Sequence, residues 1–99
     1  MYVAEFTLHA KPGHFDEVAE IYSAFAADFL STHDALESVL VLGHEADAVV
    51  RGIGVWSDRD SADAVNSDPQ FAEFNDKITP LLAGPSERVE LKLLHAYAK

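Results

Sequence analysis

A histidine, an asparagine and a tryptophan are the residues of this 99-residue chain whose chemistry and spacing best suit catalysis. His95 shares one face of an alternating segment with Leu91 and Leu93, so we expect its side chain to be partly buried. A histidine that titrates near neutral pH can take a phenolic proton as a general base. The alternative is a satisfied histidine of the core or of an interface. Asn75 can hydrogen-bond a substrate oxygen, and Trp56 can form a wall of the site.

Two glycines beside Trp56 predict a hollow in the sheet. Gly52 and Gly54 lie on the same face of a predicted strand as the tryptophan, and glycine inside a strand often marks the close approach of another group. Apolar pockets with few polar groups are typical of small-molecule sites. The alternative is that helix side chains simply fill the hollow. The candidate substrate-binding residues are Phe6, Tyr22, Phe25, Gly52, Gly54, Phe71 and Phe74, with the Tyr22 hydroxyl as a second polar contact.

Composition excludes several classes of function. The chain has no cysteine, which rules out disulfides, thiolate metal sites and a catalytic thiol. Its 17 acidic residues against 7 basic ones give a net charge of −10, which argues against nucleic acid and anionic lipid as partners. We also expect no metal site, no cofactor and no membrane span, and we expect a cytoplasmic protein. Four histidines are expected in ordinary structural or solvated positions: His9, His14, His33 and His44.

The periodicity of apolar residues predicts four strands and three helices. Period-two alternation indicates a strand and a spacing of three to four residues indicates an amphipathic helix. Asp68 before Pro69 marks a helix start, because aspartate is a good N-cap and proline suits the first helical turn. The predicted strands are 2–10, 38–44, 48–56 and 88–98, and the predicted helices are about 15–31, 59–66 and 69–79.

This order is the β-α-β-β-α-β arrangement of a ferredoxin-like α+β fold, in one domain over residues 1–99. Right-handed crossovers place the helices on one side of a four-stranded antiparallel sheet. The strands carry Val3, Leu94 and several apolar residues of 39–42 that cannot all face the helices. An exposed apolar sheet face is a liability, so we predict a homodimer packed sheet to sheet.

Three segments resemble the antibiotic biosynthesis monooxygenase family of dimeric α/β barrels: KPGHFDEV (11–18), GVWSDRDSADAV (54–65) and SDPQFAEF (67–74). The resemblance implies the fold above, a dimer with facing sheets, and one pocket per subunit between sheet and helices. Family members oxygenate quinols or anthrones without metal or flavin, and one branch degrades haem. Such chemistry needs a substrate that readily loses a proton and donates an electron to O₂. The protein supplies orientation and groups that stabilise the developing anion.

Several family residues are absent from this chain. Many members have two histidines where this chain has Val65 and Gln70, and the anthrone oxygenases often have an asparagine where it has Gly52. The haem-degrading set corresponds to Phe6, Ala64 or Val65, and Asn75, which include no iron ligand. The leading hypothesis is a cofactor-independent monooxygenase of a small aromatic quinol- or anthrone-like substrate. The alternatives are a non-catalytic ligand-binding or interaction module and another enzyme, such as an isomerase, on the same barrel.

Overall fold

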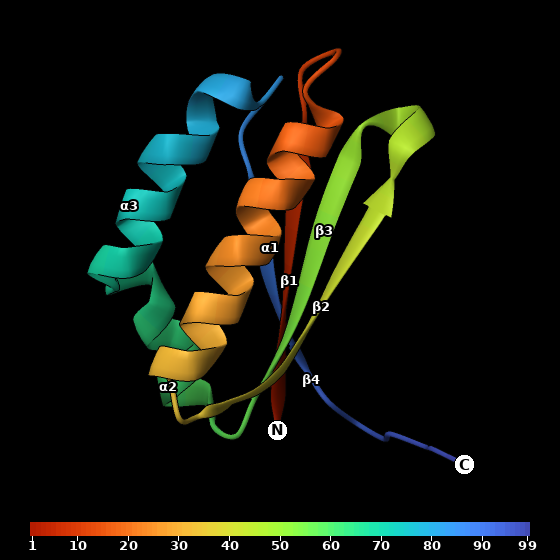
Figure 1. The fold of residues 1–99 in the computed structure, drawn as a ribbon. Coiled ribbons are helices and arrows are strands. Elements are labelled where there is room, and N and C mark those ends of the chain that lie inside the picture. Colours follow the sequence, from red (N-terminus) through yellow and green to blue (C-terminus); the bar gives the residue numbers. More distant parts are fainter.

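The computed structural model describes all residues, 1–99, as one sheet with helices packed on it (Figure 1). The order of elements is the predicted one, with single turns of 3-10 helix at Glu45–Asp47, Val65–Ser67 and Thr79–Leu81. The strands are β1 (Tyr2–His9), β2 (Leu36–His44), β3 (Val49–Trp56) and β4 (Glu87–Lys92). The helices are α1 (Phe15–Thr32), α2 (Arg59–Ala64) and α3 (Pro69–Ile78).

The sheet confirms the ferredoxin-like prediction. Its strand order is β2-β3-β1-β4, and every neighbouring pair is antiparallel. β1 is central, and its register places Phe6 opposite Gly52 on one side and opposite Arg88 on the other. Because side chains alternate between the faces of a strand, these three residues point to the same side of the sheet.

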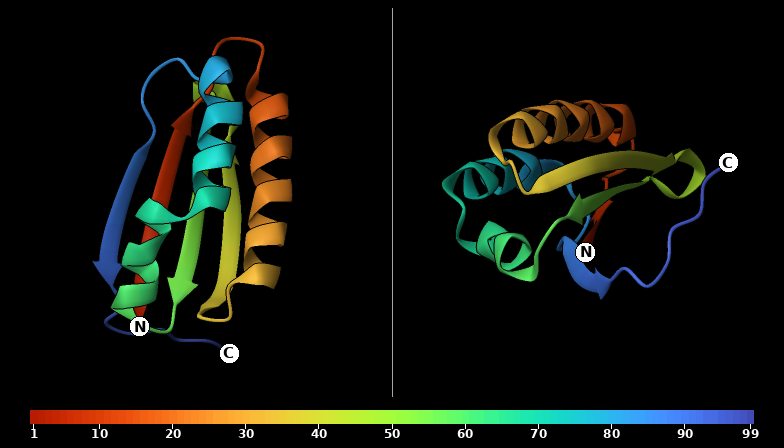
Figure 2. Two further views of the ribbon diagram at one scale, coloured as in Figure 1. Left: turned by 90° about the vertical axis from the view of Figure 1, so that its left-hand side faces the viewer. Right: turned by 90° about the horizontal axis from the view of Figure 1, so that it is seen from below.

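The helices cover one face of the sheet and enclose the core (Figure 2). Two helices begin at aspartate N-caps. The Asp58 side chain accepts a hydrogen bond from the Ser61 amide, and Asp68 accepts from the amides of Gln70 and Phe71. An N-cap carboxylate satisfies amides that have no partner within the helix. The buried residues form two clusters, one around Phe6, Leu8, Val18 and Ile78, and one around Ala4, Phe29, Leu36 and Trp56.

The other face of the sheet carries apolar side chains that no element of this chain covers. Leu40 and Leu42 of β2 are 59% and 47% exposed, and Val89 and Leu91 of β4 are 48% and 47% exposed. The register places these residues with Val3 and Ile53 on the face away from the helices. The prediction that the sheet is apolar on both faces is therefore correct for the single chain.

The predicted last strand was too long, which changes the place of His95. β4 ends at Lys92, opposite Tyr2, and the Leu93 amide donates to the Met1 carbonyl oxygen. Later residues extend past the end of β1, so they have no strand to pair with, and they run away from the sheet (Figure 1). His95 is exposed in this segment and stacks only on Tyr97, with ring centroids 6.0 Å apart. Leu94, expected within the sheet, is 76% exposed.

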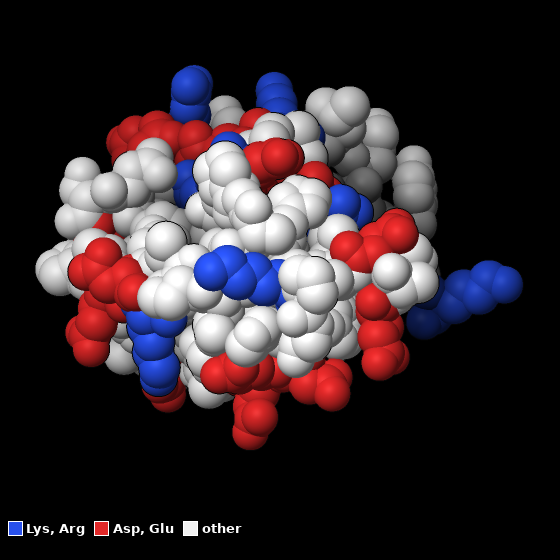
Figure 3. Space-filling model, turned by 90° about the horizontal axis from the view of Figure 1, so that it is seen from above, with Lys and Arg blue, Asp and Glu red and all other residues white.

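The surface charge follows the composition. In the view of Figure 3, lysine and arginine side chains lie singly among more numerous acidic side chains. No continuous basic patch is visible on this face, in keeping with the net charge of −10. None of the helices has the length and apolar character needed to cross a bilayer.

Candidate functional site

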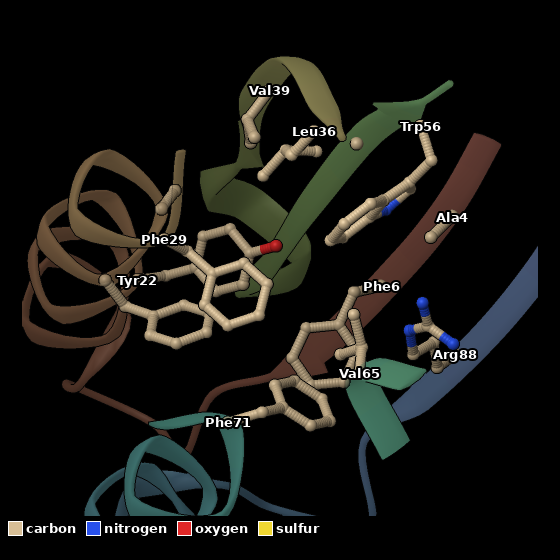
Figure 4. Close-up of a pocket in the computed structure, with 13 residues that line it drawn as sticks. Ala4, Phe6, Tyr22, Phe29, Leu36, Val39, Trp56, Val65, Phe71 and Arg88 are labelled. Atoms are coloured by element: carbon tan, nitrogen blue, oxygen red, sulfur yellow. The ribbon is translucent and has the colours of Figure 1, made fainter. Parts of the chain in front are cut away.

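A small cavity lies between the sheet and the helices, at the boundary between the two core clusters. Its volume is about 50 Å³, and 11 of its 13 lining residues are hydrophobic. Trp56 from β3, Tyr22 from α1 and Arg88 from β4 converge on it (Figure 4). The structure places six of the candidate site residues on its walls: Phe6, Tyr22, Phe25, Gly54, Trp56 and Phe71. The other lining residues are Ala4, Ala26, Phe29, Leu36, Val39, Val65 and Arg88.

The two glycines of β3 have different roles. A Cβ atom at Gly52 would overlap the hydroxyl and ring of Tyr22, and Gly52 does not line the cavity. The hollow expected at Gly52 is thus filled by a helix side chain, the alternative stated for it above. A Cβ atom at Gly54 would lie 3.5 Å from Nε1 of Trp56. The missing side chain at Gly54 therefore keeps space open beside the indole N–H.

Tyr22 brings a hydroxyl group to this apolar space. Burial raises the pKa of Tyr22 to about 12, although the positive charge of Arg88 acts in the opposite direction. The phenol is therefore neutral at physiological pH and keeps its proton for donation to a ligand. In Figure 4 its oxygen points toward β3.

Arg88 is the charged residue of the cavity, and it is not among the site residues predicted from the sequence. Its side chain is 13% exposed. One terminal nitrogen, Nη2, donates to the Ala62 carbonyl oxygen at 2.9 Å, and Nη1 lies 3.5 Å from Oε1 of Glu90. A guanidinium carries five N–H donors, so these two bonds leave donors for a ligand. The alternation of β4 contained a signal, because it places Arg88 on the face opposite to Val89.

The Glu90 carboxyl group lies beside this arginine, and the Asp63 carboxyl group lies beside Glu90. A hydrogen bond with Asp63 raises the pKa of Glu90, and burial raises it further, while Arg88 opposes both effects. Arg59 lies 3.7 Å from Asp63 on the same helix. Neither carboxyl group lines the cavity. Of the two, Glu90 contacts Arg88, and together with the Ala62 carbonyl oxygen it fixes the direction of the guanidinium.

Besides Gly52, three candidate residues lie away from the cavity. Phe74 is buried behind the wall and stacks on Phe25 with ring centroids 4.2 Å apart. Asn75 is half-buried on α3, and its backbone carbonyl accepts a hydrogen bond from the Thr79 hydroxyl. Neither residue lines the cavity. The expectation that His95 is partly buried on an apolar strand face is wrong, because β4 ends before it.

The other histidines pair with acidic residues. His9 lies 3.7 Å from Glu87, which agrees with the predicted antiparallel pairing of the first and last strands. The remaining pairs are His14 with Glu17, His44 with Asp47, and His33 with Asp68. No group of three or more histidine and acidic residues is arranged to hold a metal ion.

The cavity is smaller than the ligands that its chemistry suits. A volume of about 50 Å³ exceeds the roughly 10–15 Å³ that one water molecule needs, whereas an engineered cavity of roughly 150 Å³ holds benzene. Phe25 and Phe71 are the half-buried aromatic walls. A ring therefore enters only if such side chains move aside.

Comparison with known proteins gives a family and a fold. A sequence model of the family "Antibiotic biosynthesis monooxygenase" matches residues 1–77. A crystal structure of a candidate antibiotic biosynthesis monooxygenase from Deinococcus radiodurans superposes with a TM-score of 0.84 at 14% identity, covering 100% of this chain and 98% of that one. A candidate antibiotic biosynthesis monooxygenase from Nitrosomonas europaea superposes with a TM-score of 0.82 at 16% identity, covering 96% of this chain and 100% of that one. The crystal structure of another, from Chloroflexus aurantiacus, superposes with a TM-score of 0.74 at 20% identity, covering 98% of this chain and 96% of that one. A search of curated proteins finds no significant match.

Proposed function

Because the chain belongs to the antibiotic biosynthesis monooxygenase family, we propose that it is a cofactor-independent monooxygenase of a small aromatic quinol- or anthrone-like substrate. The observation that carries the proposal is the composition of the cavity. Eleven of its thirteen lining residues are hydrophobic, and Tyr22, one of the eleven, also brings a neutral hydroxyl, while Arg88 adds a positive charge. An aromatic ring with one or two oxygen substituents matches this arrangement.

The residues of the cavity suit the stabilisation of an anion. The guanidinium of Arg88 and the hydroxyl of Tyr22 donate hydrogen bonds to the phenolate or enolate oxygen of the substrate. Both groups favour the anion, so they lower the pKa of the substrate, and its proton leaves to water. Trp56 and the phenylalanines orient the ring and reduce the contact of the anion with water.

The chemical step then needs only the substrate and O₂. The anion gives one electron to O₂, and the substrate radical and superoxide combine into a C–O bond. With one proton returned, the product is a hydroperoxide. Loss of water converts a CH₂ group of an anthrone to a carbonyl group, so the sum is R₂CH₂ + O₂ → R₂CO + H₂O. In this scheme the protein holds and orients the anion, and the electrons come from the substrate.

The proposal includes a homodimer formed through the open faces of the sheets. Leu40, Leu42, Val89 and Leu91 are each about half exposed on this face. Apolar side chains gathered on one face are typical of protein–protein contacts. A second copy packed face to face would cover them and complete a barrel. The helix-covered cavity lies on the other side of the sheet, so each subunit keeps its own site.

A non-catalytic ligand-binding module is the second candidate. Two observations favour it: the cavity holds about 50 Å³, and none of the five histidines lines it. A binding module needs the aromatic walls but no stabilised anion. The monooxygenase therefore needs the positive charge of Arg88, whereas the binding module does not.

Oxygen uptake with a panel of reduced quinols and anthrones tests the proposal. Arg88→Gln removes the charge at the cavity, and Arg59→Gln is the matched control, because the Arg59 side chain is 69% exposed on α2. We expect turnover in the wild type and in Arg59→Gln, and a loss in Arg88→Gln. Binding without oxygen uptake, detected through Trp56 fluorescence, would support the binding module. The absence of both binding and oxygen uptake across the panel would refute both candidate functions.

A further inference from the structure

A histidine–aspartate pair joins the end of α1 to the start of α3. His33 directly follows α1, and Asp68 directly precedes α3. Nε2 of His33 lies 2.7 Å from Oδ2 of Asp68, and the two side chains are only 21% and 20% exposed. The residues are 35 positions apart in the sequence. Only the tertiary fold brings them together.

The ring of His33 is part of the aromatic packing behind the cavity. It stacks on Phe29 with ring centroids 3.7 Å apart and an angle of 21° between the planes. The ring centroids of His33 and Trp56 lie 6.2 Å apart, with 85° between the ring planes. Those of Phe29 and Trp56 also lie 6.2 Å apart, with 79° between the planes. These are the stacked and edge-to-face geometries that aromatic rings favour. Phe29 and Trp56 both line the cavity, so His33 supports two of its walls from behind.

Both ring nitrogens of His33 face oxygen acceptors. Nδ1 lies 3.0 Å from the Phe29 carbonyl oxygen and 2.9 Å from Oγ1 of Thr32, and Nε2 faces the Asp68 carboxylate. The Asp68 carboxylate can only accept a hydrogen bond, so Nε2 of His33 donates the proton of this contact. The Asp68 carboxylate at the start of α3 also matches the positive end of that helix dipole.

The second oxygen of Asp68 fixes another part of the cavity. Oδ1 accepts hydrogen bonds from the amides of Gln70 at 2.8 Å and Phe71 at 3.4 Å. Burial acts to raise the pKa of Asp68, but the hydrogen bonds from His33 and these two amides lower it below its ordinary value. The ionised carboxylate therefore holds Phe71 through one oxygen and the His33 ring through the other.

We propose that His33 and Asp68 are positioning residues of the ligand site, which hold Trp56, Phe29 and Phe71 in place without touching the ligand. The identity of the ligand rests on the function proposed above. The positions of the three aromatic side chains do not depend on that function, because His33 and Asp68 hold them in the unliganded protein.

The fluorescence of Trp56, the one tryptophan of the chain, provides the test. Asp68→Ser keeps an N-cap for α3, since serine caps about as well as aspartate, but its side chain is too short to reach His33. Asp58→Ser is the matched control, because Asp58 caps α2 and has no histidine partner. His33→Ala removes the ring, and His33→Gln keeps an N–H donor for Asp68 without the ring.

We expect Trp56 emission to shift to longer wavelength, and quenching by acrylamide to increase, in Asp68→Ser and His33→Ala but not in Asp58→Ser. His33→Gln should show a smaller change than His33→Ala. Circular dichroism at the same pH checks that each variant is folded. Unchanged emission and quenching in folded Asp68→Ser and His33→Gln would overturn the proposal and leave the pair as a simple helix contact.

The oxygen-uptake assay separates this proposal from the proposed function. With an anthrone as substrate, we expect KM to rise in Asp68→Ser and to stay at the wild-type value in Asp58→Ser. If the wild type shows no uptake but the fluorescence responds as described, the positioning role stands and the monooxygenase proposal fails. If uptake is normal and the fluorescence of the folded variants does not respond, the positioning role fails alone.

Discussion

Replacement of Gly52 by alanine tests how tightly α1 is packed on the sheet. The new Cβ would overlap the Tyr22 hydroxyl and would lie 2.6 Å from its ring carbon Cε1, closer than any ordinary contact. Tyr22 is 6% exposed, so it cannot move aside without disturbing the core. Overpacking of this kind costs about 1–3 kcal/mol, whereas alanine without a clash would gain about 0.5–1 kcal/mol over glycine in a strand.

The expected result is a net loss of about 1–2 kcal/mol in the free energy of unfolding. For a chain of this size, each kcal/mol lowers Tm by about 4–8 °C. Urea denaturation followed by circular dichroism measures the change, at one protein concentration for all variants because association also affects apparent stability. Gly54→Ala is the control. Its nearest contacts, 3.3 Å to Leu36 and 3.5 Å to Trp56, need only small shifts, so we expect a change near zero.

A double-mutant cycle identifies the cause of the loss. Tyr22→Phe should not relieve the clash, because the ring carbons remain in the way. Tyr22→Leu removes the ring, so Gly52→Ala should cost less in that background, with a coupling energy of about 0.5–3 kcal/mol. A Gly52→Ala variant as stable as the wild type, or a cost that persists unchanged with Tyr22→Leu, would refute the reasoning.

Three further predictions concern charge and association. Arg88→Gln should lower kcat/KM for oxygenation by roughly 10²–10³, the usual effect of removing an oxyanion donor, and wild-type kinetics would contradict its role. Leu40→Glu should give a monomer in sedimentation, whereas Ile21→Glu on the helical side should not, and a monomeric wild type would refute the proposed dimer. The pKa of Asp68 is lower in the folded chain than its ordinary value of 3.8, so its stabilising effect is present above that value and lost as pH falls through the folded pKa. Asp68→Asn should flatten the dependence of unfolding free energy on pH in this acidic range, and an unchanged slope would contradict the assignment.

The local pattern of the sequence was enough to predict the order of elements and the aromatic walls around Trp56. Alternation identified β1, the apolar runs identified β2 and β3, and the helical spacing of apolar residues identified α1 and α3. Asp68 and Pro69 identified the start of α3 within one residue, because capping depends on neighbours in sequence. The aromatic walls around Trp56 followed from the same patterns, since residues on the buried face of α1 must meet the sheet.

The tertiary structure decided which face of β4 points inward and what fills each hollow. Alternation shows that a strand has two faces, but pairing with β1 determines which of them the helices cover. That pairing turned Arg88 toward the cavity and Val89 outward, and it ended the strand before His95. Likewise, the side chain of Tyr22 occupies the space at Gly52, and His33 meets Asp68 across 35 positions. These contacts join residues distant in sequence, so they depend on how the helices pack on the sheet and not on any local pattern.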